Sequence, residues 1–379
     1  MTTKIRDGYK QTEVGVIPKD WEICNLSEAT DFLDGQRRPV KSADRIKVSG
    51  VYPYYGASGI IDYVNDYIFE DDLILLGEDG ENILSRNLPL AFQVKGKIWV
   101  NNHAHVLKPK ESFEIGFLTD YLESLDYALI NSGTAQPKLN KQACLKIKIV
   151  KPTKSEQMAI ATALGDADAL ITSLEKLIKK KRTIKQGAMQ ELMKPKEGWE
   201  VKKLGEIGDV TMGQSPLSLF YNTQSIGLPL IQGNADVENR KTIIRTYTSA
   251  ITKRGKIGDT IMSVRAPVGE ISKATFNCCL GRGVCAIVYK NEYLYHYLIY
   301  FEKSWAKFST GSTFDSVNSK QVKELEISIP RSEEAQTRIA TILSEMDAEI
   351  TTLEQKLGKY KLIKQGMMQE LLTGKIRLI

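Results

Sequence analysis

Residues 157–193 read QMAIATALGDADALITSLEKLIKKKRTIKQGAMQELM, and residues 336–372 read QTRIATILSEMDAEITTLEQKLGKYKLIKQGMMQELL. The two stretches align without gaps and are identical at about 20 of 37 positions, far above chance. Their closest match is the tail IKQGxMQEL, at 184–192 and 363–371. The chain is therefore an internal repeat, and the long helices that these stretches predict decide its architecture.

Apolar residues recur in both stretches at alternating spacings of three and four, which is the seam of a coiled coil. Ser155 and Ser332, each followed by an acidic residue, provide helix starts just after Pro152 and Pro330. We expect two helices roughly 50 Å long that pack antiparallel, with an approximate two-fold axis between them. The alternative is that each stripe is ordinary core packed on its own domain. The seam residues are Ile160, Leu164, Ile171, Leu174 and Ile178 in the first helix, and Ile339, Leu343, Ile350, Leu353 and Leu357 in the second.

Shorter matches extend the repeat upstream of the helices. PKDWE at 18–22 resembles PKEGWE at 195–200, and DGQ at 34–36 resembles MGQ at 212–214. NSGT at 131–134 resembles STGS at 309–312, and an alternating strand follows each before Pro152 and Pro330. The bodies between these markers align poorly. Their short alternating apolar runs predict mixed α/β domains of the α+β type.

In the predicted organisation, the first long helix lies between the two globular bodies and the second follows the second body. A helix is also expected inside each body, at FLTDYLESLDYAL and at YLYHYLIYFEKSWAKF. The segments are an N-terminal arm at 1–20, a first domain at 21–152, a helix at 153–193, a linker at 194–198, a second domain at 199–330, and a second helix with the tail at 331–379.

Composition excludes several classes of protein. A chain of 379 residues is long enough for two or three domains, and its net charge of +6 permits an acidic partner without requiring one. No apolar run approaches ~18 residues, so no membrane span is expected, and the polar N-terminus lacks the core of a signal peptide. Five cysteines without a CxxC pair argue against a disulfide framework or a zinc site. A cytoplasmic protein is expected.

Loops of the first body carry side chains that suit base reading. Tyrosines can stack on bases, carboxylates can accept from cytosine, and asparagine can pair with adenine. The alternative for each residue is an ordinary turn or strand-edge polar group. The candidates are Tyr54, Tyr55 and Ser58 in YPYYGASG, Glu78 and Asp79 in LLGEDGEN, and Asn101, Asn102, His103 and His105 in NNHAH.

The second body offers a smaller set, with the same alternative. Arginine to guanine is the commonest specific contact with a base. A run of Lys and Arg at 176–185 could touch phosphate, although such runs more often form a solvated or partner-facing surface. The candidates are Gln232 and Asn234 in IQGNAD, Arg265 in SVRAPVG, and Arg282 in GRG.

Catalytic motifs are missing from the sequence. There is no Gly-rich phosphate loop followed by Lys-Ser/Thr, and no Gly-rich strand-loop for S-adenosylmethionine. Asn87-Leu88-Pro89-Leu90 lacks the second proline and the aromatic residue of an amino-methyltransferase motif. His103 and His105 would face opposite sides of a strand, which is poor geometry for one metal ion. We therefore predict no catalytic site, cofactor or metal in this chain.

The order of motifs resembles the specificity subunit of type I restriction-modification enzymes over nearly the whole chain. The resemblance implies two target-recognition domains, each reading one half of a split asymmetric double-stranded DNA site, with the two helices as a spacer. It also implies two methyltransferase subunits and motor-nuclease restriction subunits as partners, which would bind S-adenosylmethionine and ATP. The motifs are TEVGVIPKDWE, YPYYGASGIIDYV, LLGEDGEN, SGTAQPKLN, MSVRAPVGEI and the twin IKQGxMQEL tails.

Two other functions remain open from the residues alone. One is a coiled-coil scaffold, or a regulator of such a complex, that binds protein and not DNA. The other is a fused restriction-methylation enzyme, which the missing motifs disfavour. DNA binding that weakens with added salt would separate the first alternative from a DNA reader.

Overall fold

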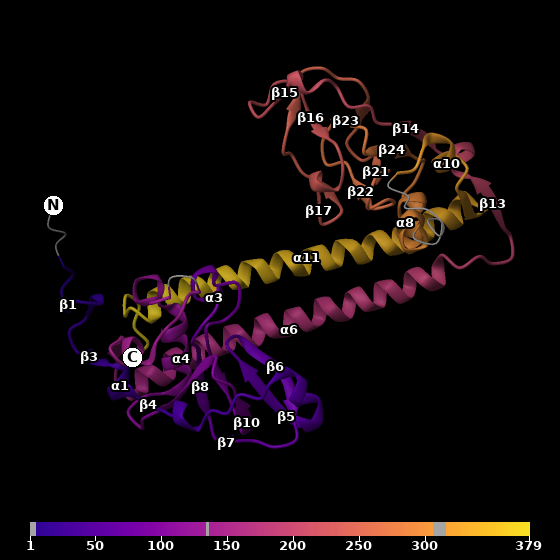
Figure 1. The fold of residues 1–379 in the computed structure, drawn as a ribbon. Coiled ribbons are helices and arrows are strands. Elements are labelled where there is room, and N and C mark those ends of the chain that lie inside the picture. Colours follow the sequence, from indigo (N-terminus) through magenta and orange to yellow (C-terminus); the bar gives the residue numbers. More distant parts are fainter. Residues whose placement is uncertain (1–4, 134–135, 306–315) are drawn as a thin grey trace. The chain divides into compact units, whose positions relative to one another are not determined.

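The computed structural model describes residues 5–133, 136–305 and 316–379, and the chain forms two compact units (Figure 1). The first unit contains residues 1–175 and 355–379, and the second contains residues 176–354. Each unit thus holds one globular domain with a part of both long helices. The loop predicted at 309–312 lies outside the described residues, as do Thr134 of its counterpart and residues 311–315. The predicted fold class, two mixed α/β domains with two long helices in an internal repeat, is confirmed.

The two long helices are α6 (Lys154–Leu192) and α11 (Glu333–Leu371), each of 39 residues. Within each unit, residue numbers fall along α11 as they rise along α6, so the helix segments run antiparallel. Ion pairs join α6 to α11, and the N–O distances of Asp168–Lys364, Glu175–Lys361 and Lys181–Glu349 are 2.6–2.7 Å. The first unit contains Asp168–Lys364 and Glu175–Lys361, and the second contains Lys181–Glu349 and Lys185–Asp347.

The predicted seam is buried or half-buried along both helices. Near the helix ends it packs on the domain cores, and farther along α6 it packs where the two helices pair. Ile160 and Leu164 belong to the core of the first domain, and Leu343 belongs to the core of the second. Farther along α6, Ile171 and Leu174 are buried outside those cores, where α6 pairs with α11. Ile178 and Ile350 are also buried, whereas Ile339, Leu353 and Leu357 are half-buried.

The first domain contains two four-stranded sheets. Strands form at 73–77 and 104–109, so His105 lies in a strand as expected, whereas His103 lies in the turn before it. The helix α4 (Ile115–Ser124) ends earlier than its apolar pattern suggested and packs against β9. One sheet has the order β4 (Thr30–Phe32), β11 (Ala104–Pro109), β8 (Leu73–Gly77), β9 (Ala91–Val94); the other has the order β6 (Gly59–Val64), β5 (Ser49–Gly56), β10 (Lys97–Val100), β7 (Phe69–Glu70).

The second domain repeats this topology although the two sequences align poorly. One sheet continues beyond the four equivalent strands to β18 (Lys241–Thr242) and β17 (Val237–Glu238), and helix α8 (Tyr293–Phe301) takes the place of α4. The first sheet begins with β14 (Asp209–Met212), β24 (Val284–Val288), β21 (Thr260–Ser263), β22 (Ile271–Lys273); the second is β15 (Tyr221–Asn222), β19 (Tyr247–Thr248), β16 (Leu228–Ile231), β23 (Cys278–Leu280), β20 (Arg254–Gly255).

The correspondence includes strand direction. β5 pairs parallel with β10, which pairs antiparallel with β7. In the second domain β16 pairs parallel with β23, which pairs antiparallel with β20. The antiparallel order β4-β11-β8-β9 likewise matches β14-β24-β21-β22. The repeat therefore extends through the bodies as a backbone framework, which carries different side chains in each copy.

The beginning and end of each domain are tied together by one strand pair. β3 (Glu22–Asn25) pairs with β12 (Lys148–Lys151), and β13 (Trp199–Lys203) pairs with β25 (Glu326–Pro330). A hairpin of β1 (Tyr9–Thr12) and β2 (Gly15–Pro18) precedes the first pair.

The C-terminal tail packs on the first domain. The Arg377 guanidinium lies over the Trp21 ring at 5.7 Å and binds the carboxylates of Asp20 and the buried Glu156. The Trp21 indole N–H donates to the same Glu156 at 2.9 Å. Because Glu156 is out of contact with water, these two donors supply the partners that a buried carboxylate needs.

Candidate nucleic-acid interface

Loops that follow three strands of the second domain meet at one edge. The Gly281 N–H donates to the Ile231 carbonyl at 2.7 Å, and the Val264 N–H donates to the Gly283 carbonyl at 2.9 Å. These bonds join the ends of β16 and β21 to the turn between β23 and β24. The predicted residues Gln232, Arg265 and Arg282 each follow one of the bonded residues, so the structure gathers them on one edge.

Glycine is required where these loops touch. A Cβ atom on Gly283 would lie 2.0 Å from the Gln232 carbonyl oxygen, and one on Gly281 would lie 3.0 Å from the Gln232 Cα. The GRG sequence therefore lets two loops pack backbone to backbone while Arg282 between the glycines is exposed. Its N–H donates to the Ser215 hydroxyl at 3.0 Å, which brings a fourth loop to the edge.

The polar side chains on this edge are available to a ligand. Arg265, Arg282 and Gln232 are exposed. Within the described part of the chain, neither guanidinium has a carboxylate at ion-pair distance. Asn234 is half-buried, and its amide donates to Glu270. Free guanidinium groups can bind guanine or phosphate, and base contact by these four residues stays a prediction.

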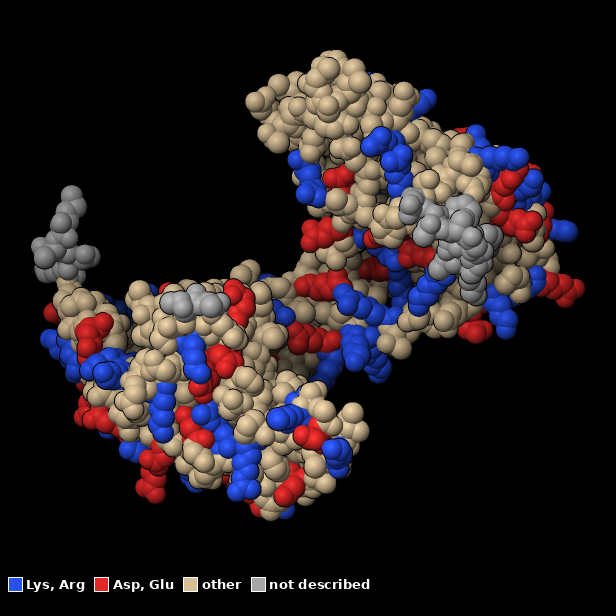
Figure 2. All heavy atoms as spheres, viewed as in Figure 1, with Lys and Arg blue, Asp and Glu red and all other residues tan. Residues whose placement is uncertain are grey.

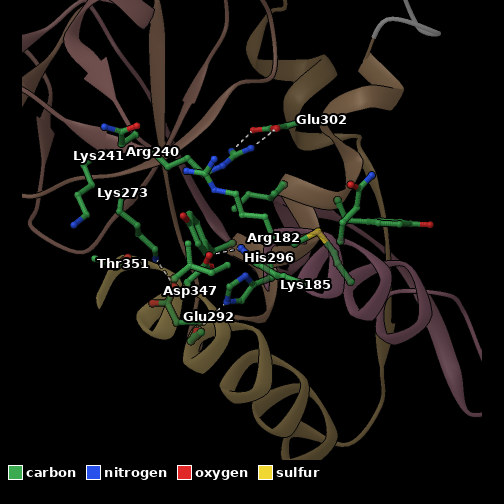
Figure 3. A pocket seen from close by; sticks show the side chains of 18 of the residues that line it. Arg182, Lys185, Arg240, Lys241, Lys273, Glu292, His296, Glu302, Asp347 and Thr351 are labelled. Atoms are coloured by element: carbon green, nitrogen blue, oxygen red, sulfur yellow. Dashed lines mark hydrogen bonds and ion pairs between the residues drawn. The ribbon is translucent and has the colours of Figure 1, made fainter. Parts of the chain in front are cut away.

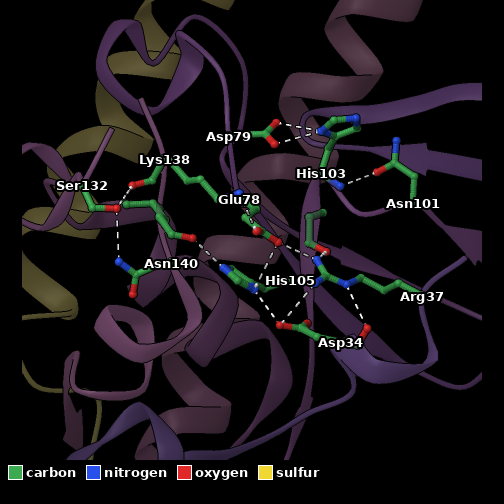
Figure 4. Close-up of polar contacts among 12 residues, drawn as sticks. Asp34, Arg37, Glu78, Asp79, Asn101, His103, His105, Ser132, Lys138 and Asn140 are labelled. Carbon is green, nitrogen blue, oxygen red and sulfur yellow. Dashed lines mark hydrogen bonds and ion pairs between the residues drawn. The ribbon is translucent and has the colours of Figure 1, made fainter. Parts of the chain in front are cut away.

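The first domain has a comparable edge, shown in Figure 4. The Glu78 N–H donates to the His103 carbonyl at 2.8 Å, which joins the loop after β8 to the turn before β11. His103 Nδ1 lies 2.9 Å from both carboxylate oxygens of Asp79, and the His103 N–H donates to Asn101 Oδ1 at 2.8 Å. His103 and Asn102 are exposed. Asp79, His103 and Asn102 thus stay candidates for base contact.

His105 is a buried structural residue, so the prediction that it contacts DNA is wrong. Its side chain is 0% exposed, with Nδ1 2.8 Å from Asp34 Oδ2 and Nε2 2.8 Å from the Leu139 carbonyl (Figure 4). Burial opposes protonation of the ring, but the hydrogen bond and charge of Asp34 outweigh it and raise the pKa of His105 to about 10. The imidazolium links η1 (Asp34–Gln36), β11 and the loop before Asn140.

Glu78 belongs mainly to the same network. Its carboxylate lies 2.7 Å from the Arg37 guanidinium and 3.3 Å from Lys138 Nζ, and its side chain is 13% exposed. Burial raises the pKa of Glu78, but Arg37 and His105 more than offset this and hold it below the usual value. Glu78 therefore orients the loop on which its neighbour Asp79 lies.

Tyr54 and Asn101 also differ from expectation, because both side chains are buried. The Tyr54 hydroxyl accepts from the Val40 N–H at 2.9 Å, and Asn101 holds the His103 backbone. Because these side chains are buried, neither can present its polar group to a base in this fold. Tyr55 and Ser58 are half-buried, Tyr55 with its ring beside Phe92, so contact with DNA stays a prediction for these two.

The residues that sequence reasoning missed are the supports beneath these loops. Asp34, Arg37 and Lys138 join the network of His105 and Glu78, and Ser215 holds the Arg282 loop. The match of DGQ at 34–36 with MGQ at 212–214 was a signal for two of them, since each segment lies at or just after the end of the first strand of a sheet. Asp34 and Ser215 lie in or beside those segments.

Each unit also has a groove between its long-helix segments and its short helix. The groove of the first unit, about 1220 Å³, is lined by α4 and by Asp168, Lys364 and Gln365. The groove of the second, about 950 Å³ and shown in Figure 3, is lined by α8 and by the repeat counterparts of those residues. These counterparts are Asp347, Lys185 and Gln186.

The two grooves differ in charge. The second carries Arg182, Arg240, Lys241 and Lys273, with Arg240 held by Glu302 and Lys273 by Glu292 (Figure 3). His296 is buried there, and its Nε2 forms a hydrogen bond of 2.8 Å with the Ser344 hydroxyl. Burial lowers the pKa of His296 to about 3. The first groove instead carries Asp120 of α4, 3.8 Å from Lys364.

Figure 2 shows Lys and Arg side chains interspersed with Asp and Glu over the visible face of the first domain, with no large patch of a single charge. The tip of the second domain around β15 shows almost no charge in that view. Among the described residues, no group of three or more His, Cys, Asp or Glu is arranged to hold a metal ion. Within the same residues, no helix is long and apolar enough to cross a bilayer.

Comparison with known proteins places this chain in one family. The type I restriction modification DNA specificity domain matches the chain twice, at 18–186 and 196–364. The chain therefore belongs to this family. A putative type I restriction enzyme MjaX specificity subunit from Methanocaldococcus jannaschii is 27% identical over 98% of this chain and 97% of that protein. A putative specificity subunit from Haemophilus influenzae is 28% identical over 88% and 89%.

A solved structure shares the fold. The crystal structure of the type I restriction-modification S subunit from M. genitalium superposes with a TM-score of 0.68 at 15% identity, covering 97% of this chain and 98% of that one. A chain from a study of type I complex assembly and conformational transition gives a TM-score of 0.58 at 22% identity, covering 95% and 99%. Family membership confirms the predicted class, a non-catalytic specificity subunit, and disfavours the fused enzyme.

Proposed function

We propose that this specificity subunit reads a split, asymmetric DNA duplex, one half with each domain. The supporting observation is that one backbone framework presents two different sets of side chains at the same edge. Asp79 and His103 lie on the first edge, whereas Arg265 and Arg282 lie on the second. Base edges differ in their donors and acceptors, so unlike side chains select unlike half-sites.

Binding to randomised duplexes tests this function. The purified chain, alone and with its methyltransferase subunits, selects from a duplex pool at several salt concentrations. We expect two different short half-sites with a fixed gap, and an affinity that falls linearly on logarithmic axes as salt increases. Selection of no sequence, together with a flat salt dependence, would favour a protein-binding scaffold over a DNA reader.

The partner subunits are part of the proposal. The long-helix side of both grooves is lined by counterpart residues of the repeat, so one partner protein can use this side of each, and we assign the grooves to two methyltransferase subunits. S-adenosylmethionine would bind in those subunits, ATP would bind in the motor-nuclease subunits, and the complex would work in the cytoplasm. Methylome sequencing of cells with and without this gene reports target and activity together.

Stoichiometry provides the test of docking. Gln186 and Gln365 are exposed counterparts that line the two grooves. Gln186→Trp and Gln365→Trp should each fill one groove, so that native mass spectrometry finds one methyltransferase subunit instead of two. The double variant should bind none. Two bound subunits in the double variant would remove the grooves as docking sites without touching the DNA-reading assignment.

A further inference from the structure

Asp79 and Arg265 occupy the same position in the two domains. The Leu139 N–H donates to the Glu78 carbonyl at 2.7 Å, and the Val317 N–H donates to the Val264 carbonyl at 2.8 Å. The residue after each acceptor then forms an isolated β-bridge, Asp79 with Lys138 and Arg265 with Ser316. These hydrogen bonds and bridges make the two residues equivalent, although the sequences of the two bodies align poorly.

The position is fixed from two further sides. Asn140 and Asn318 follow the bridge partners by two residues, and each caps a short helix by accepting a backbone N–H, from Ala143 at 2.9 Å and from Gln321 at 3.0 Å. The preceding residues, Glu78 and Val264, are equivalent as well. The N–H of Glu78 donates to the turn before β11, and the N–H of Val264 donates to the turn before β24. The framework therefore holds this position rigidly in both domains.

The chemistry offered at this position is opposite in the two domains. Arg265 is exposed and presents only N–H donors, which match the O6 and N7 acceptors of guanine. Asp79 presents carboxylate oxygens and holds Nδ1 of His103 at 2.9 Å. In the neutral ring with Nδ1–H donated to Asp79, His103 Nε2 is an acceptor. The side chain of His103 is 49% exposed, so a ligand can reach the ring.

We propose that this shared position specifies one base in each half-site, and that the two bases are of different kinds. Arg265 selects guanine in the half-site of the second domain. Asp79 and His103 select a base that offers an amino group to the major groove, adenine or cytosine, in the half-site of the first. The inference rests on the proposed function and deepens it, since it says which residues make the site asymmetric and how.

Selection from randomised duplexes with the full chain and its methyltransferase subunits tests the proposal. The variants are Arg265→Ala, His103→Ala and Asp79→Asn, with Arg331→Ala as a control. Arg331 is an exposed arginine of the same unit with a 74% exposed side chain, at the junction of β25 and α11. Melting curves check that each variant is folded, above all Asp79→Asn, whose side chain is only 20% exposed.

We expect Arg265→Ala to lose about 5- to 150-fold of the preference for guanine at one position of the second half-site, with the first half-site unchanged. His103→Ala and Asp79→Asn should relax one position of the first half-site only, and Arg331→Ala should leave both unchanged. An equal loss of affinity for all sequences would identify phosphate contacts and overturn the proposal, as would unaltered preferences. Failure of the unsubstituted complex to select any sequence would instead overturn the proposed function itself.

Discussion

Lys364 of α11 donates to Asp168 of α6 at 2.7 Å, and Lys185 of α6 pairs with Asp347 of α11 in the same way. The two lysines correspond in the repeat, as do the two aspartates. Both lysine side chains are largely buried, at 19% and 13% exposed, so the pairs lie close to the helix interface. The lysines occupy seam positions where an apolar residue would otherwise continue the heptad pattern.

Removing either lysine charge should destabilise the fold moderately. We expect Lys364→Met and Lys185→Met each to lower the free energy of unfolding by about 1 kcal/mol, since the aspartates are nearly half exposed and partly solvated. The effects should add, because the pairs share no residue. The more exposed pair Glu175–Lys361 gives a control, and Lys361→Met should change stability by less than about 0.5 kcal/mol. Equal losses in all three variants by urea denaturation would contradict this.

Asp120 should make the first unit less stable as pH rises. Burial raises the pKa of Asp120 to about 6, with Lys364 opposing the rise and Asp168 adding to it. The folded state therefore binds this proton more tightly than the unfolded chain does. The stabilisation is complete below about pH 4 and is lost as pH rises through about 6. We expect Asp120→Asn to raise the free energy of unfolding by about 1–3 kcal/mol at pH 8, and to change it little near pH 4. A gain independent of pH would rule out titration as the cause.

The helices and the repeat could be predicted from sequence because both signals are local. The 3,4 spacing from Ile160 to Ile178 encodes one buried face of a helix. Ser332 caps α11 as predicted, whereas α6 begins one residue before Ser155 and is capped by Thr153. The shared topology of the two bodies could not be predicted in this way. It resides in backbone pairing, as in β5 with β10 and β16 with β23, which different side chains can satisfy.

His105 should contribute to stability, and not to base reading. His105→Leu removes the closer of the two cations beside the buried Asp34 and leaves only Arg37 at 3.7 Å, which should cost about 3 kcal/mol at pH 7. Because the pKa of His105 is raised to about 10, its contribution is complete below about pH 6.5 and is lost as pH rises through 10. The variant and the parent should therefore converge in stability toward pH 10. His103→Ala, at an exposed imidazole two residues away, serves as the control and should cost less than about 1 kcal/mol.

The candidate site was predictable in its segments but not residue by residue. Composition and turn patterns pointed to the NNHAH loop, yet only the fold distinguishes exposed His103 from buried His105. Tyr54 was misjudged for a related reason, since an aromatic residue in a Gly-punctuated strand serves a core as readily as a surface. The equivalence of Asp79 and Arg265 depends on hydrogen bonds between distant segments, which no local pattern records.

Lengthening both long helices should change the gap between the half-sites. One heptad on each helix lies between the ion pairs Glu175–Lys361 and Arg182–Glu354. Duplicating residues 176–182 in α6 and 355–361 in α11 preserves the seam and adds about 10 Å of helix at ~1.5 Å per residue, the length of about three base pairs. If the helices act as the spacer, duplex selection should recover the same two half-sites with a gap longer by about that amount.

A matched control distinguishes spacing from damage to the helices. Duplication in α6 alone leaves seven residues without a partner on α11, so it should lower the melting temperature and weaken binding without defining a new gap. Because each domain keeps its own reading loops in the double duplication, the half-site sequences themselves should not change. An unaltered gap in the double duplication, with the melting temperature retained, would show that the domains and not the helices determine the spacing.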